Sequence, residues 1–105
     1  MRFEKENVVI VARSLKLREM AKFFDISGFS QEIMADQANL QKHIFKLVSN
    51  FIDAIEQMNL ISEITLNGEK ITFEAFESDT NNFSAMVDFI FEYINHILNP
   101  QKKTT

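Results

Sequence analysis

Apolar residues recur at helical spacing in two long segments, from about Gln37 to Met58 and from about Asn82 to Leu98. Their apolar positions lie three and four residues apart, which is the spacing of an amphipathic helix. A shorter segment of the same kind, roughly Ser14 to Phe24, is followed by the helix-breaking pair Ser27-Gly28. The pattern therefore predicts two long helices and one short helix.

Alternation with a period of two flanks the pair Asn67-Gly68. Asn-Gly is preferred in a type I′ turn, because both central residues need a positive φ. A two-residue loop then fixes the register: Leu66 opposite Glu69, Ile64 opposite Ile71, Ser62 opposite Phe73 and Leu60 opposite Ala75. This register predicts a hairpin with one buried face and one wet face.

A two-stranded hairpin is marginal in water, so it needs a helix or a third strand to pack against. The segment Val8 to Ala12 is nearly all β-branched and is the candidate third strand, although it also fits an early turn of the first helix. We expect an α+β fold in the order β-α-α-β-β-α, with a small antiparallel sheet packed against two long helices and one short helix. The predicted domain covers residues 1–100, and residues 101–105 form a disordered tail.

Composition agrees with a folded globular protein, since 46% of the 105 residues are hydrophobic and 25% are charged. There is no cysteine, which excludes disulfides and thiolate metal sites and fits a reducing compartment. The start of the chain is too charged for a signal peptide. The longest apolar run, Val8 to Ala12, is far too short to span a bilayer. We therefore expect a cytoplasmic protein that does not bind membranes.

The sequence contains few residue patterns that are typical of catalytic sites. His43 and His96 lie on different predicted helices, and no zinc-binding histidine spacing occurs. The two glycines are isolated, so no phosphate-binding loop is present. Asp53 and Glu56 are helical neighbours, but this pair is typical of a solvated face. We expect no enzyme activity, no cofactor and no metal.

The net charge of −4 is unevenly distributed. Residues 1–22 carry six basic and three acidic groups, whereas residues 50–100 carry nine acidic groups and one lysine. An acidic half repels nucleic acid and anionic membranes and attracts a basic protein partner, unless the carboxylates serve solubility alone. The predicted docking surface comprises Glu63, Glu69, Glu74, Asp88 and Glu92.

The eleven phenylalanines exceed what a small core requires, unless several rings are only partly buried. Phe89 and Tyr93 are four residues apart and lie off the main apolar stripe of the last helix, which predicts a second face for a homodimer or a docking groove. The function expected from charge and apolar surplus is a non-enzymatic protein-protein interaction module: an inhibitor, immunity protein, adaptor or chaperone-like protein.

A resemblance supplies the alternative function. The segment Leu17 to Ser27 resembles the first helix and turn of helix-turn-helix proteins, through Ala21, Asp25, Ile26 and Ser27. The segment Phe51 to Ile61 looks like the end of a recognition helix that enters a wing, and the Asn67-Gly68 hairpin corresponds to that wing. The resemblance, over residues 8–76, implies a winged-helix regulator that binds DNA.

The chain departs from that family in spacing and in charge. The gap between Ile26 and the recognition-like segment is longer than the family's compact turn. Only Lys42 and Lys46 on the recognition-like helix would meet phosphates, and the wing carries three glutamates and a single lysine, Lys70. Binding to nucleic acid is therefore not the favoured interpretation.

Overall fold

The computed structural model describes residues 1–29 and 35–98, so the predicted tail over 101–105 lies outside the described residues. The chain divides into two compact units, one made of residues 1–14 with residues from 61 onward, the other of Leu15–Leu60. The first unit holds all the described strands together with helices, and the second is helical. This confirms the predicted α+β class, while the prediction of one domain over 1–100 stays a prediction.

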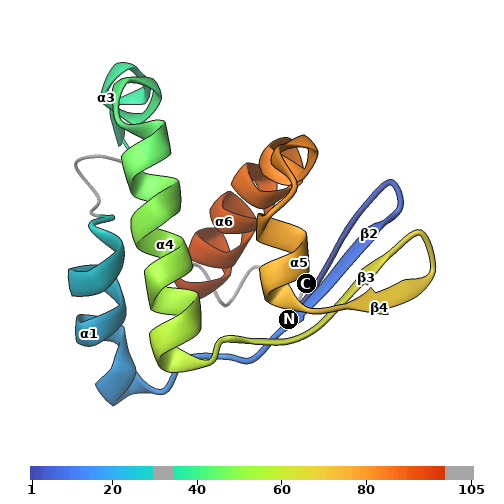
Figure 1. The fold of residues 1–105 in the computed structure, drawn as a ribbon. Helices are drawn as coiled ribbons and strands as arrows, with labels where there is room; N and C mark the ends of the chain where they lie inside the picture. The colour runs from blue at the N-terminus through green and yellow to red at the C-terminus, as the bar shows by residue number, and fades with distance from the viewer. Residues whose placement is uncertain (30–34, 99–105) are drawn as a thin grey trace, which may run out of the picture. The chain divides into compact units, whose positions relative to one another are not determined.

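The first unit contains a four-stranded antiparallel sheet in the order β1-β2-β3-β4 (Figure 1). The strands are β1 (Arg2–Lys5), β2 (Val8–Ala12), β3 (Ile61–Leu66) and β4 (Glu69–Ile71). The prediction that Val8 to Ala12 is a strand is confirmed. Strand β1 was not predicted, and it pairs with β2 through a tight turn in which Glu6 has φ 53°.

One face of the sheet is apolar and buried. Phe3, Ile10, Ile64 and Ile71 stand opposite one another across the four strands. The first three are at most 3% exposed, and Ile71 on the edge strand is half-buried. Their neighbours along each strand point to the other face, because side chains alternate along a strand. The sheet therefore has the one buried face that the alternation predicts.

The β3–β4 hairpin follows the predicted register only at its tip. Leu66 pairs with Glu69 and Ile64 with Ile71, and both turn residues have positive φ, 54° at Asn67 and 83° at Gly68. The predicted pairs of Ser62 with Phe73 and Leu60 with Ala75 are wrong, since β4 ends at Ile71.

Helix α5 (Phe73–Glu77) replaces the rest of the predicted strand. Its first turn is capped by the Thr72 hydroxyl, which accepts a hydrogen bond of 3.1 Å from the backbone N–H of Ala75. The same turn buries Phe76 completely. The cap and the buried ring together explain why the chain leaves the sheet after Ile71.

Helix α6 (Phe83–Leu98) begins within one residue of the predicted position and follows a short 3-10 turn, η1 (Thr80–Asn82). The ring of Phe89 meets the ring of Phe3 edge to face, with centroids 5.7 Å apart. This contact places α6 against the apolar face of the sheet. The buried side chains of α6 are Ala85, Met86, Phe89, Ile90, Tyr93, Ile94 and Ile97.

The second unit contains helices α1 (Leu17–Ser27), α3 (Gln37–Lys42) and α4 (Ile44–Met58). Helix α1 starts later than predicted, because the carboxylate of Glu19 accepts a hydrogen bond from the N–H of Lys16, at 2.9 Å, and so caps the helix there. It ends at Gly28, which has φ 74°, as the Ser27-Gly28 pair predicts. The aromatic rings of Phe23 and Phe51 join α1 to α4, with centroids 5.4 Å apart.

Two sequence-based expectations for this unit are wrong. The helix predicted over residues 37–58 is divided at His43, which has φ −115° and ψ 16°. No glycine or proline occurs at this division, and the apolar periodicity continues through it. The sequence pattern therefore gives no sign that the helix is divided here. The turn expected at Asp25 is also absent, because Asp25, Ile26 and Ser27 all lie within α1. The helix-turn-helix resemblance therefore fails at its central position.

Candidate functional site

The five carboxylates of the predicted docking surface lie on four elements of the first unit. Glu63 is on β3, Glu69 on β4 and Glu74 on α5, while Asp88 and Glu92 are on α6. Two of the five are neutralised by lysines. Lys70 Nζ lies 3.3 Å from a carboxylate oxygen of Glu63, and Lys5 is bound to Asp88.

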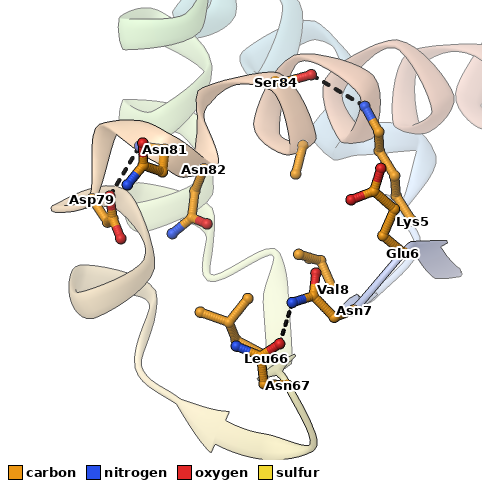
Figure 2. Close-up of a pocket in the computed structure, with 11 residues that line it drawn as sticks. Lys5, Glu6, Asn7, Val8, Leu66, Asn67, Asp79, Asn81, Asn82 and Ser84 are labelled. Atoms are coloured by element: carbon orange, nitrogen blue, oxygen red, sulfur yellow. Dashed lines mark hydrogen bonds between the residues drawn. The ribbon is translucent and has the colours of Figure 1, made fainter.

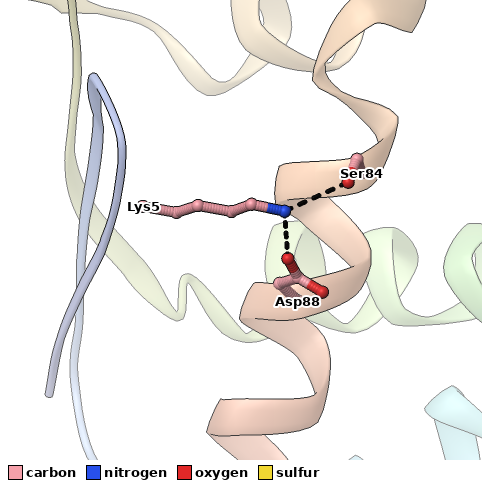
Figure 3. Close-up of polar contacts among 3 residues, drawn as sticks. All are labelled: Lys5, Ser84 and Asp88. Carbon is pink, nitrogen blue, oxygen red and sulfur yellow. Dashed lines mark hydrogen bonds and ion pairs between the residues drawn. The ribbon is translucent and has the colours of Figure 1, made fainter.

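The Lys5 side chain crosses from β1 to α6, as Figure 3 shows. Its ammonium group donates to the hydroxyl of Ser84, at 3.1 Å, and to the carboxylate of Asp88 one turn later. The pair is partly screened by water, since the side chains of Lys5 and Asp88 are 34% and 48% exposed. Asp88 is therefore a structural link between strand and helix rather than a spare negative charge.

The prediction that Phe89 and Tyr93 form a second, exposed face of the last helix is wrong. Each side chain is 1% exposed, so neither is available to a partner. The physical reason is that other parts of the protein bury side chains around more of the α6 circumference than its main apolar stripe. Helical spacing alone does not show how much of that circumference is buried. Phe91, which points elsewhere, is half-buried.

An exposed run of carboxylates remains along β4 and α5. We call its four members the acidic segment: Glu69, Glu74, Glu77 and Asp79, all exposed. The sequence prediction selected the first two and missed the other two, although all four contributed to the acidic balance of residues 50–100. Lys70 is the one basic residue between positions 69 and 79, and it is paired with Glu63. Between positions 69 and 79, four exposed carboxylates therefore outnumber the single lysine.

A polar pocket of about 450 Å³ lies at the end of the acidic segment (Figure 2). It lies between the β1–β2 turn, the β3–β4 turn and the start of α6. The side-chain amide of Asn7 donates to that of Asn67 and so links the two turns. Asp79 accepts the backbone N–H of Asn81 at 2.9 Å, which shapes the third wall.

The pocket offers hydrogen-bonding groups and a small excess of negative charge. Its lining includes the carboxylates of Glu6 and Asp79 and one cationic side chain, Lys5, which is already bound to Asp88. Such a lining accommodates a polar or cationic group better than an apolar one. Sequence reasoning missed the pocket, and its available signal was the recurrence of asparagine in the segments that form it: Asn7, Asn67, Asn81 and Asn82.

Residues 1–29 and 35–98 show neither the geometry of a metal site nor that of a membrane span. In that part of the chain, no three histidine, cysteine or acidic side chains are grouped as metal ligands. None of the helices described there has the length and apolar character needed to cross a membrane. No known protein family model matches the chain, and no curated protein or solved structure shows significant similarity to it.

Proposed function

We propose that the protein is a non-enzymatic interaction module whose acidic segment docks a basic surface of another protein. The observation that carries this proposal is the exposure of four carboxylates between Glu69 and Asp79, while the single lysine in that stretch is paired with Glu63. Opposite charge steers a partner during diffusional encounter and fixes its orientation. An inhibitor, adaptor, immunity or chaperone-like role uses such a surface.

The polar pocket beside Asp79 strengthens this proposal. A flat charged surface attracts many cations, whereas a recess with fixed hydrogen-bond acceptors selects a particular shape. Glu6 and Asp79 contribute carboxylates to the recess, and the linked amides of Asn7 and Asn67 contribute fixed polar groups. In our proposal, one lysine or arginine side chain of the partner enters this recess while its neighbours meet the acidic segment.

DNA binding is not favoured by the two surfaces that the winged-helix resemblance would place on DNA, α4 and the β3–β4 hairpin. The exposed charges of α4 are one lysine, Lys46, and the two carboxylates Asp53 and Glu56. The lysine of the β3–β4 hairpin is paired with a glutamate. DNA-binding surfaces gain most of their affinity from unpaired lysine and arginine side chains.

The proposal is tested by charge reversal of Glu69, Glu74 and Glu77 to lysine together. Asp79 is left unchanged because it caps η1. The matched control reverses Asp25, Asp53 and Glu56, which are also exposed, on α1 and α4, and change the net charge by the same amount. The probe is a fluorescent peptide rich in lysine and arginine, with a nonspecific DNA duplex measured in parallel.

We expect the unmodified protein to bind the peptide with an association rate that falls as salt rises, and not to bind the duplex. The reversal in the acidic segment slows association, and the control reversal leaves most of it intact. Equal loss in both variants contradicts a defined docking surface. Salt-sensitive binding to the duplex supports the winged-helix alternative instead.

A further inference from the structure

Strand β1 lies at one edge of the sheet that the described residues form, and the direction of its backbone groups follows from two hydrogen bonds. The amino group of Met1 donates to the carbonyl of Ala12 at 2.7 Å, and the N–H of Ala12 donates to the carbonyl of Met1 at 2.9 Å. Such doubly bonded pairs alternate along an antiparallel ladder. Phe3 and Lys5 therefore also bond to β2, whereas the N–H and C=O groups of Arg2 and Glu4 point away from the sheet.

We propose that this edge pairs with the same edge of a second copy of the chain, joining the two sheets across a two-fold axis at Phe3. In that register Arg2 stands opposite Glu4 of the second copy, and Glu4 stands opposite Arg2 of the second copy. Both residues have outward-pointing backbone groups, so each pair exchanges both of its main-chain hydrogen bonds. A two-fold contact of this kind closes on itself and leaves a dimer.

Charge selects this register over its neighbours. A shift that centres the axis on Arg2 places two arginines opposite each other, and one centred on Glu4 places two glutamates opposite each other. Like charges directly across a ladder are destabilising, whereas opposite charges stabilise it. A shift by a single residue places the outward-pointing N–H and C=O groups of one copy opposite residues whose backbone groups point inward, so the main-chain hydrogen bonds between the copies are lost. Within one copy the Arg2 guanidinium and the Glu4 carboxylate form an ion pair at 2.6 Å, with the two side chains 63% and 59% exposed. An ion pair this exposed contributes little to stability, so each side chain can exchange its partner for the oppositely charged residue of the second copy.

The usual obstacle to edge pairing is removed by α6. A lysine that points to the buried side of an edge strand normally discourages another strand from pairing. Here Lys5 is that residue, but its ammonium group is bound by Asp88 and Ser84 of the same chain (Figure 3).

Beside β1 lies a shallow groove of about 440 Å³, lined by residues that include Phe3 and the half-buried ring of Phe91. The sheet's apolar face continues toward this groove. Phe3 itself is 3% exposed, so the apolar surface that a second copy can cover here is that of Phe91.

The test is sedimentation equilibrium from micromolar to millimolar concentration at low salt, with any purification tag placed at the C-terminus. We expect a reversible dimer. Arg2→Glu and Glu4→Arg each raise its dissociation constant at least about tenfold, because each single change places like charges across the axis. The double swap keeps the opposite charges and returns the constant to within about threefold of the original value.

Two further variants separate this contact from general effects. Glu4→Pro removes an outward N–H that β1 does not use for pairing with β2, so it abolishes the dimer while the monomer stays folded. Glu63→Arg is the matched control, since it makes the same reversal in another ion pair of the sheet and leaves the dimer unchanged.

A protein that remains monomeric over the whole range overturns the proposal. A double swap as weak as the single reversals overturns it too, as does a dimer that withstands Glu4→Pro. The proposal does not depend on the acidic segment, because reversal of Glu69, Glu74 and Glu77 leaves Arg2 and Glu4 untouched.

Discussion

The hydroxyl group of Tyr93 donates a hydrogen bond of 2.9 Å to the backbone carbonyl of Arg13. Tyr93 lies in the middle of α6 and is 1% exposed, and Arg13 follows the last residue of β2. The bond therefore ties the covering helix to the point where the chain leaves the sheet. It also gives this buried tyrosine a polar partner, as buried hydroxyl groups require.

Tyr93→Phe tests this bond, because it removes the hydroxyl and keeps the ring. We expect the free energy of unfolding to fall by about 1 kcal/mol, measured by urea denaturation. Tyr93→Leu is the comparison, since it removes both the bond and the ring packing and should lower the stability further. Equal stability of the tyrosine and phenylalanine proteins would contradict a stabilising role for the bond.

Phe89→Ala should be strongly destabilising, because the ring is 1% exposed and packs edge to face on Phe3. Loss of a buried phenylalanine ring typically costs about 3–5 kcal/mol. Phe91→Ala is the matched control on the same helix, where the half-buried ring should matter much less. Thermal unfolding of both variants, at concentrations too low for association, decides between them. Similar melting temperatures for the two would contradict the burial of Phe89.

Gly68→Val should lower the stability by about 1 kcal/mol or more, since a β-branched residue is strained at the φ of 83° found there. A Cβ at this position meets no atom within 4 Å, so the cost comes from the backbone alone. Gly68→Asn, which tolerates positive φ better, should cost less. Chemical denaturation of the two variants measures the difference. A valine protein as stable as the asparagine protein would show that the turn has another conformation.

Asp88→Asn should reduce stability by less than about 1 kcal/mol, because the Lys5–Asp88 pair is partly exposed. The reduction should shrink at high salt, which screens the pair in the original protein. A double-mutant cycle with Lys5→Met isolates the interaction between the two side chains. A coupling energy that is unchanged by salt would argue against an electrostatic origin.

Local signals in the sequence predicted much of the fold. The Asn67-Gly68 turn, the strand at Val8 to Ala12 and the end of α1 at Gly28 all depend on residues close to one another in the chain. Helix α6 was predicted within one residue of its start, because its apolar spacing is continuous. These features need only turn chemistry, β-branching and helical periodicity.

The features that the sequence did not predict arise where a segment suits two kinds of secondary structure, or where a contact joins residues far apart in the chain. The predicted register placed Thr72 in a strand, whereas in the structure its hydroxyl caps α5. The helical turn that begins after Thr72 buries Phe76, and this burial depends on residues distant in sequence. The partner of Asp88, Lys5, is 83 residues away in the sequence, and local pattern does not reveal it. Glu63 and Lys70 share one face of the predicted hairpin, so the register did contain the signal for that pair. Strand β1 was hidden by its charged residues, which resemble those of a loop.

The pairing of Ala12 with Ile61 has a consequence for the order in which the chain folds. The whole helical unit, Leu15–Leu60, lies between these two neighbouring strand positions, so the central ladder of the sheet can form only by closing a very long loop. Contacts so distant in sequence form slowly, whereas helix contacts within that loop form early. We therefore expect the helices of residues 15–60 to gain structure first, and the β2–β3 junction to be the rate-limiting step of folding.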